Sequence, residues 1–336
     1  MKIFVKTLLC AVLTLGPMMT PKVIAGPPAF GPLPGEYAIG TLEAGHLLTA
    51  RDGGHHSIDA VITSATTAGP NEKFRFERMQ PNYTLIKTSG GYYVSAAGGG
   101  GLGDNYDAAQ ILQTERTSLA DDALFNIRSS APGISSNPFT IQTFRNYYLT
   151  ALGGGGKSSR AFHTDAVKYN GYWEAFQVLK CGDLGSDYDY AIKAKGVGFG
   201  YPLQTSNGGG QIKNAVAFFA QILGTGGAQR FKLGRQPDGS YSLQTSNRIN
   251  YVTAINGGGL ASGTKDWDNL VANRTQVQAW EKFRIVDRGD CSYTIQTTNN
   301  WYVAFSPGRG ISTRISDPNA APSIGYTAYF QLIPFL

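Results

Sequence analysis

Tyr293-Thr-Ile295-Gln-Thr297 is the clearest copy of a short pattern that recurs along the chain. The pattern is an aromatic residue, an aliphatic residue two places later, and a threonine or alanine two places after that. Its copies begin at Tyr37, Tyr83, Phe139, Tyr190, Tyr241 and Tyr293. In the copy at Tyr83 the threonine comes one place late. A period of two predicts a strand with one buried face.

A phenylalanine closes each segment that this pattern opens. These residues are Phe74, Phe125, Phe176, Phe231, Phe283 and Phe330, which lie roughly 50 residues apart. Repetition at a fixed period is typical of architectures built from one supersecondary unit. We therefore number the segments repeats 1 to 6, expect a repeat β protein, and look for its function on the loops.

The N-terminus has the features of a secretory signal peptide. Lys2 and Lys6 precede an apolar run over 8–15, and a small residue precedes Gly26. We predict a signal peptide over 1–25, which implies a secreted, periplasmic or extracellular protein. The apolar run is too short to cross a bilayer and no other segment is long enough, so we expect no membrane span.

The net charge gives little support for a nucleic-acid partner. The whole chain carries 29 basic and 23 acidic residues, and Lys2, Lys6 and Lys22 belong to the predicted signal peptide. Without those three lysines, 26 basic residues stand against 23 acidic ones, a net charge of +3 rather than +6. Nucleic-acid binding depends on a strong positive field, so we expect none.

A polar, glycine-bearing stretch over 181–187 divides the six repeats into three and three, and residues 26–35 form a Pro/Gly-rich leader. We predict an all-β fold of two tandem β-trefoil domains of three repeats each, covering 36–180 and 184–336. A closed barrel of this kind leaves few unpaired strand edges. A single six-bladed propeller is the alternative, because repeats of about 50 residues also form propeller blades.

Two cysteines remain beyond the predicted signal peptide, which contains Cys10. Cys181 and Cys291 each precede the first strand of a repeat. An oxidising compartment permits a disulfide between them. The sequence leaves open whether the two cysteines pair or stay as free thiols.

Three blocks of repeat 5 resemble a known family. They read Tyr251-Val-Thr-Ala-Ile-Asn-Gly257-Gly-Gly259, Leu270-Val-Ala-Asn-Arg-Thr275 and Trp280-Glu-Lys-Phe283. Together they resemble the fascin-type β-trefoil repeat of actin-bundling fascins, which also occurs in modules attached to secreted bacterial and plant glycoside hydrolases. The resemblance covers residues 36–336 and is specific in repeats 2, 3 and 5. It implies the β-trefoil fold. A ricin-type trefoil matches less well, since the chain has a single Gln-x-Trp triplet of that type.

The chain shows no catalytic or cofactor-binding pattern. Its four histidines lack the spacing of zinc ligands, and phosphate-loop, dinucleotide and nucleophile-elbow motifs are missing. Glycosidases need two opposed carboxylates, and nothing singles out such a pair among 23 acids. We expect no enzyme activity, no cofactor and no metal. Arg288-Gly-Asp290 matches an integrin-type tripeptide, but a turn before the strand at Tyr293 is the simpler interpretation.

Glycine runs occupy residues 98–101, 153–156, 208–210 and 257–259. Glycine adopts a positive φ without strain, so we interpret these runs as tight turns rather than phosphate cradles. The loops that follow two of them, in repeats 2 and 5, place an aromatic residue between two aspartates. The candidate ligand-binding residues are Asp104, Tyr106, Asp107, Asp266, Trp267 and Asp268.

Such loops are suited to sugars, because an aromatic face stacks on the C–H face of a sugar ring and carboxylates accept hydrogen bonds from hydroxyl groups. The alternative is that Tyr106 and Trp267 fold back onto their barrels while the aspartates form turns. We expect Trp173 and Trp280, which lie next to closing phenylalanines, in core or rim packing.

The sequence favours a secreted, lectin-like protein with several shallow carbohydrate-binding sites. Two domains in one chain would gain avidity on a polysaccharide or glycoconjugate. The alternatives are a fascin-like cross-linker of filaments or other proteins, and an accessory protein of a glycosidase. The export signal argues against actin as the partner. An enzyme whose site is not readable from one sequence ranks third.

Overall fold

Strands and short 3-10 segments make up the regular structure that the computed structural model describes, so the chain is all-β. The described residues are 35–41, 45–58, 60–80, 82–100, 112–129, 139–151, 162–165, 174–185, 188–196, 202–210, 216–218, 227–260 and 269–335. None of the helices in these ranges has the length and apolar character needed to cross a membrane.

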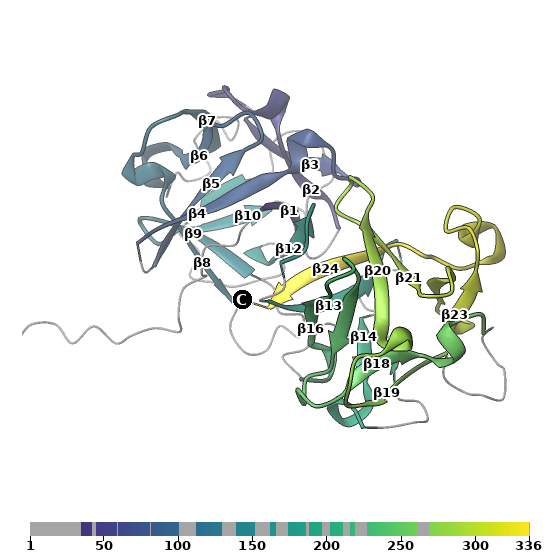
Figure 1. The fold of residues 1–336 in the computed structure, drawn as a ribbon. Helices are drawn as coiled ribbons and strands as arrows, with labels where there is room; N and C mark the ends of the chain where they lie inside the picture. The colour runs from purple at the N-terminus through teal and green to yellow at the C-terminus, as the bar shows by residue number, and fades with distance from the viewer. Residues whose placement is uncertain are drawn as a thin grey trace, which may run out of the picture.

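The first half of the chain forms a 12-stranded sheet (Figure 1), here called unit 1. Its strands are β1 (Glu36–Thr41), β2 (Leu47–Ala50), β3 (Val61–Ala65), β4 (Phe74–Gln80), β5 (Tyr83–Thr88), β6 (Tyr93–Ala96), β7 (Leu112–Arg116), β8 (Phe125–Ser129), β9 (Phe139–Thr143), β10 (Tyr148–Ala151), β11 (Phe162–Asp165) and β12 (Phe176–Cys181). Strands β1, β4, β5, β8, β9 and β12 pair in a closed ring. The hairpins β2–β3, β6–β7 and β10–β11 attach to this ring.

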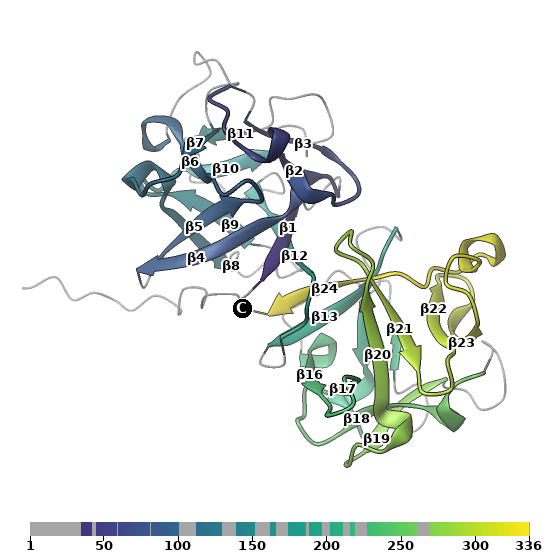
Figure 2. The ribbon, with the colours of Figure 1, turned by 45° about the horizontal axis from the view of Figure 1, so that its top comes forward.

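The second half repeats this arrangement as unit 2 (Figure 2). Its strands are β13 (Asp189–Ala194), β14 (Leu203–Thr205), β15 (Val216–Phe218), β16 (Phe231–Arg235), β17 (Tyr241–Gln244), β18 (Tyr251–Ala254), β19 (Leu270–Arg274), β20 (Lys282–Asp287), β21 (Tyr293–Thr297), β22 (Tyr302–Ser306), β23 (Gly310–Ile315) and β24 (Phe330–Phe335). Here β13, β16, β17, β20, β21 and β24 close the ring. Two closed rings rule out the propeller alternative, in which each repeat would form a separate blade.

The sequence pattern and the closing phenylalanines meet across each ring. In unit 2 the first residue of the pattern pairs with the closing residue of the same repeat: Tyr190 with Phe231, Tyr241 with Phe283, and Tyr293 with Phe330. All six closing phenylalanines along the chain are at most 1% exposed. The aliphatic residue at the centre of the pattern is buried in the core of its own unit in five of the six copies; in the copy at Tyr83, Leu85 lies in a smaller buried cluster and Ile86 takes the core position.

Repeat 2 departs from the predicted register by one residue. Thr84, not Tyr83, pairs with the closing Phe125. An irregularity in β4, between Arg78 and Gln80, shifts the pairing where β5 begins. Tyr83 therefore takes the other side of the strand, and its ring lies 5.8 Å from the ring of Phe144. The threonine that comes one place late was the sign of this shift.

Short 3-10 segments follow the second strand of several repeats and precede most closing strands. They are η1 (Arg51–Gly53), η2 (Pro70–Glu72), η3 (Ala97–Gly99), η5 (Asp121–Ala123), η8 (Ser206–Gly208), η9 (Gly227–Gln229), η10 (Ile255–Gly257), η11 (Ala279–Glu281) and η12 (Ala321–Ile324). At η3 the residues Gly98, Gly99 and Gly100 have φ of 61°, 81° and 91°. Residues with a side chain rarely adopt such values, so the described glycine runs, at 98–100, 208–210 and 257–259, form tight turns. The run at 153–156 lies outside the described residues.

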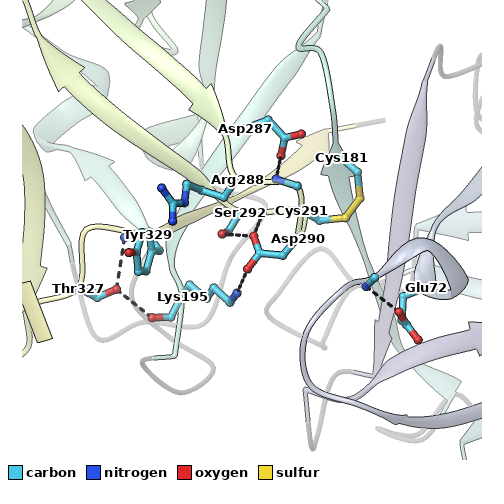
Figure 3. A network of polar contacts seen from close by, with 12 residues as sticks. Glu72, Cys181, Lys195, Asp287, Arg288, Asp290, Cys291, Ser292, Thr327 and Tyr329 are labelled. Atoms are coloured by element: carbon cyan, nitrogen blue, oxygen red, sulfur yellow. Dashed lines mark hydrogen bonds and ion pairs between the residues drawn. A yellow bond between two sulfur atoms is a disulfide. The ribbon is translucent and has the colours of Figure 1, made fainter. Parts of the chain in front are cut away.

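The two units meet at β12 and β24, which lie side by side (Figures 1 and 2). A buried cluster spans the junction; its members are Ala38, Leu47, Ala68, Leu179 and Cys181 of unit 1 and Ala191, Cys291 and Ile333 of unit 2. Cys181 and Cys291 form a disulfide (Figure 3), and each is 1% exposed. The two cysteines are therefore paired, a point that the sequence left open. The Tyr293 hydroxyl also donates to the Gly182 carbonyl, at 2.9 Å.

Candidate functional site

The residues nominated from the sequence lie outside the described part of the chain: Asp104, Tyr106, Asp107, Asp266, Trp267 and Asp268. The structure does describe where their two loops begin and end. One loop joins β6 to β7 and the other joins β18 to β19, so each connects the strands of a hairpin in the middle repeat of its unit. The two loops therefore occupy equivalent places in the two units.

An open depression of about 280 Å³ lies at the base of the first loop. Three segments of unit 1 contribute to it: η3, the segment from the end of β7 through η5, and the turn between β9 and β10. Its lining residues are Gly98, Gly99, Arg116, Ala120, Asp121, Asp122, Phe144 and Arg145. Gly100, directly after this lining, is the last described residue before the loop that contains Tyr106.

Hydrogen bonding in this depression is incomplete among the described residues. Arg116 Nη2 donates to Asp122 Oδ2 at 3.0 Å. The other carboxylate oxygen, Asp122 Oδ1, is buried and accepts from no described donor. A buried acceptor left without a donor costs about 1–3 kcal/mol. Asp121, the next residue, is exposed and presents its carboxylate to solvent.

Phe144 and Arg145 stand next to each other in the turn between β9 and β10. The Phe144 side chain is 40% exposed, and the Tyr83 ring supports one side of it. The stem of Arg145 lies against Gly99, because a Cβ built there would come within 3.0 Å of the arginine Cδ and Nε. The Arg145 guanidinium makes no hydrogen bond or ion pair with any residue in the described ranges.

The equivalent place in repeat 5 is closed by hydrogen bonds. Glu281 is 3% exposed, and its Oε1 accepts from Thr253 Oγ1 at 2.8 Å. Its Oε2 accepts from the Gln278 backbone N–H, also at 2.8 Å. Asn299, which stands in repeat 6 where repeat 3 has Arg145, donates to the Asn256 carbonyl of repeat 5 at 3.0 Å. The polar groups of this turn therefore satisfy one another.

Repeat 2 lacks a counterpart of Glu281, the residue that accepts the hydrogen bonds in repeat 5. Ala123 occupies the position two places before the closing phenylalanine, where repeats 1, 3 and 5 have Glu72, Glu174 and Glu281. Ser95 corresponds to the threonine that donates to Glu281, and its hydroxyl is buried without a described partner. The missing glutamate is the one sign in the sequence that could have pointed to this site.

Trp280, expected in core or rim packing, does not belong to the core. Its side chain is 41% exposed, on η11 beside the buried Glu281. The tryptophan precedes the glutamate in the motif, and the 3-10 turn directs these two neighbours to opposite sides. Trp173, the other tryptophan expected to pack, lies outside the described residues.

A second depression, of about 430 Å³, lies at the junction of the units. It is lined largely by the linker backbone around Gly182, together with Glu36, Lys180 and Asp183. Lys180 Nζ lies 4.8 Å from the centre of the Tyr37 ring. Burial lowers the pKa of Lys180, and the nearby Asp183 and Glu36 oppose this effect. The lysine thus packs on a ring of unit 1, and we assign no ligand site to this depression.

The Arg288-Gly-Asp290 tripeptide is part of a structural turn (Figure 3). Asp290 Oδ2 accepts from Lys195 Nζ at 2.6 Å, and Oδ1 accepts from the Ser292 backbone N–H at 3.1 Å. Burial opposes ionisation of Asp290, but the hydrogen bonds from Lys195 and Ser292 outweigh it and lower the pKa. The aspartate is therefore engaged within the fold.

Within the described ranges, no group of three or more His, Cys, Asp or Glu side chains is placed to hold a metal ion. His55 lies against Tyr92, with ring centroids 5.2 Å apart, whereas His56 Nε2 contacts Asp52 Oδ2 at 3.2 Å. The adjacent histidines thus have different partners. The unit 1 depression offers instead an aromatic face, a guanidinium and a carboxylate in one open hollow, which suits reversible binding of a polar ligand with apolar faces.

Comparisons with known proteins place the chain in no family. No protein-family model matches it, and no curated protein matches it. A solved mosquitocidal holotoxin is similar over 91% of this chain at 12% identity and a TM-score of 0.38. The match covers 35% of the holotoxin, so the chain spans about a third of that protein's length.

Two smaller solved proteins match parts of the chain. The designed 3-fold symmetric protein ThreeFoil is similar over 43% of this chain and 98% of its own, at 11% identity and a TM-score of 0.35. The Rhizoctonia solani agglutinin is similar over 46% of this chain and 98% of its own, at 14% identity and a TM-score of 0.34. At these TM-scores the similarities add nothing to the fold that the strand pairing describes.

Proposed function

We propose that this protein is a secreted, non-catalytic carbohydrate-binding protein built as two tandem β-trefoil domains of three repeats each. The domains would cover 36–180 and 184–336, after a signal peptide over 1–25 and a leader over 26–35. Two closed rings of six strands with attached hairpins support the trefoil assignment. The fascin-like motifs of repeats 2, 3 and 5 support it independently.

The unit 1 depression carries the functional proposal. Phe144 presents an exposed ring, on which the C–H face of a sugar stacks. Asp121 accepts hydrogen bonds from sugar hydroxyls, and Arg145 donates them. Sugars need this combination, because they have alternating apolar faces and hydroxyl edges. The open shape suits a residue within a polymer as well as a chain end.

The two hairpin loops would complete the sites. In unit 1 the loop with Asp104, Tyr106 and Asp107 departs from Gly100, at the edge of the depression, and would add a second aromatic face. In unit 2 the loop with Asp266, Trp267 and Asp268 departs from the equivalent turn after η10. Two sites on one chain would give avidity on a polysaccharide or glycoconjugate surface.

A glycan array and polysaccharide retention assays test this proposal. We expect the mature protein to be retained on at least one glycan, and Phe144→Ala to weaken that retention by roughly tenfold through loss of the stacking face. Ile249→Ala is the control, because Ile249 is an exposed apolar residue in a turn of unit 2, between β17 and β18, and is 60% exposed. No retention on any sugar, or equal losses in both variants, would refute the proposal.

A double variant tests the loop residues. Tyr106→Ala with Trp267→Ala should strongly reduce retention, whereas each single change should leave partial retention through the other unit. Circular dichroism and thermal unfolding should match the parent, because loop tips contribute little to the core. A double variant that binds like the parent, or that fails to fold, would show that these aromatic residues are not binding platforms.

Co-sedimentation with filamentous actin separates the cross-linker alternative from the lectin proposal. We expect no pelleting with actin. If the protein pellets with actin and competing sugars do not reverse this, filament binding becomes the better proposal and carbohydrate binding is refuted.

A further inference from the structure

We propose that the unit 1 depression selects sugar residues that carry a carboxylate, of the uronate type, and that Arg145 is the residue that reads this group. The inference rests on the proposed function and adds the class of ligand to it. It depends on which charged side chains of the depression already form ion pairs within the protein.

The two arginines of the depression differ in their availability. Arg116 is committed, because its guanidinium donates to Asp122 at 3.0 Å. Arg145 makes no hydrogen bond or ion pair with a described residue, although it lines the same hollow. Among the described residues that line the depression, the formal charges of Arg116, Arg145, Asp121 and Asp122 cancel, and Asp104 and Asp107 of the β6–β7 loop would add negative charge. Net charge therefore does not attract anions to the depression, and selection of a carboxylate has to come from the position of one guanidinium.

The Arg145 side chain is exposed, and its stem runs over the backbone of Gly99. Its Cγ, Cδ and Nε would lie within 3.0–3.2 Å of a Cβ at that position. Gly99 has φ of 81°, a value that disfavours any other residue there, so the stem has room to pass. The planar fork of the guanidinium matches a carboxylate with two parallel hydrogen bonds.

The neighbouring groups define what else the ligand must offer. Phe144 precedes Arg145 in the same turn, so one sugar ring can lie on the phenyl face while a substituent at its edge reaches the guanidinium. Asp121 would accept hydrogen bonds from the hydroxyls on the ring. A neutral sugar would use Phe144 and Asp121 but would leave the guanidinium with solvent alone. A uronate residue uses all three groups.

Pairs of polymers that differ only in the charge of the carboxyl group test this inference. Polygalacturonate, alginate and hyaluronan are each compared with their methyl esters, in pull-down assays with the mature protein. We expect at least one acid form to be retained at least tenfold better than its ester. Arg145→Gln should reduce that retention to the level of the ester, and Arg145→Lys should restore only part of it, because an ammonium lacks the planar fork.

Arg314→Gln is the matched control. It removes the same charge from an exposed position on β23 of unit 2, and we expect it to leave retention unchanged. Equal retention of every acid and its ester would overturn the inference while glycan binding on the array still supports the proposed function. An equal loss in Arg145→Gln and Arg314→Gln would also overturn it, because net charge alone would then explain the retention. If Arg145→Gln loses retention of both the acid polymer and its methyl ester, the inference is also overturned.

Discussion

Repeat 2 and repeat 5 are equivalent in position but differ in how completely their turns are hydrogen-bonded. Repeat 5 buries Glu281 and ties it to Thr253 and to the Gln278 backbone. Repeat 2 has Ala123 at that position and leaves the Ser95 hydroxyl and one Asp122 oxygen without described donors or acceptors. In one turn the buried polar groups are hydrogen-bonded to one another, whereas in the equivalent turn some buried polar groups lack a described partner.

This difference indicates which part of the molecule is scaffold and which part is available to a ligand. A turn that satisfies its own polar groups gains nothing from a partner, whereas an open turn has donors and acceptors to offer. The β9–β10 turn of repeat 3 lines the same depression and adds an exposed aromatic residue, Phe144, and the Arg145 guanidinium, which makes no hydrogen bond or ion pair with a described residue. We therefore assign scaffold to the repeat 5 turn and binding to the repeat 2 turn, and the following variants test that division.

Removing the disulfide should have the largest effect, because it separates the units that contain the two repeats. Cys181→Ser with Cys291→Ser opens a link across 110 residues and should lower the free energy of unfolding by about 4 kcal/mol. Urea unfolding followed by fluorescence and circular dichroism measures this, and the unit with the lower stability should then unfold first. Each single variant should lose as much as the double variant. An unchanged urea midpoint would show that the crosslink does not stabilise the pair of units.

Removing the closing glutamate of repeat 5 should come next. Glu281→Ala deletes a buried acceptor and leaves the Thr253 hydroxyl and the Gln278 N–H without it, which should cost about 3 kcal/mol of unfolding free energy. Glu281→Gln keeps one acceptor oxygen and should lose less. Thermal and urea unfolding measure both. If Glu281→Ala is as stable as the parent, the hydrogen bonds of Glu281 do not stabilise the fold, and the repeat 5 turn is not a scaffold for that reason.

Installing a glutamate in repeat 2 is the converse change. Ala123→Glu should place a carboxylate within reach of the Ser95 hydroxyl and the Ala120 N–H, and should stabilise the protein by about 1 kcal/mol. The buried glutamates of repeats 1, 3 and 5 show that the repeat accommodates this side chain. Ala123→Gln is the uncharged control in the same unfolding assay. Destabilisation by both changes would mean that repeat 2 has a different backbone and that its open hydrogen bonds are not a simple loss.

Giving repeat 3 the turn residue of repeat 6 should change stability least. Arg145→Asn should be able to donate to the Gly98 carbonyl of repeat 2, as Asn299 donates to the Asn256 carbonyl of repeat 5, and unfolding free energy should stay within about 0.5 kcal/mol of the parent. Retention on an acidic glycan should nevertheless fall. Asn299→Arg, the reverse change, should weaken the contact of repeat 6 with the repeat 5 turn without creating retention. A loss of stability in Arg145→Asn would assign this arginine to the scaffold.

The sequence predicted the rings well because the fold repeats its own pattern. Alternation at Tyr293 and burial at Phe330 depend on local periodicity and on six copies of the same constraint. The one error of register, at Tyr83, arose where β4 contains an irregularity that a strict period cannot represent. The glycine runs were readable for the same local reason, since positive φ restricts the residue type.

The disulfide and the depression depend on contacts between distant segments, so the sequence alone did not reveal them. Cys181 and Cys291 meet only because the turn between β20 and β21 packs on the end of β12. The depression collects residues from three turns, and apart from the glycine run at Gly98 and Gly99 they form no motif with their neighbours in sequence. Comparison of the repeats with one another, position by position, would have set Ala123 and Ala328 of repeats 2 and 6 apart from the glutamates of repeats 1, 3 and 5.

The covalent link between the units also sets a length scale. Residues 182–188 alone would let the units move apart by on the order of 20 Å, since an extended residue spans about 3.3–3.6 Å. The disulfide and the buried cluster around it remove that freedom, so the β6–β7 and β18–β19 hairpins keep one separation. Under the proposed function, a polymer whose recognised residues recur at this separation would engage both hairpins, and other polymers would engage one. The protein would then distinguish polysaccharides by the periodicity of their chains as well as by the sugars they contain.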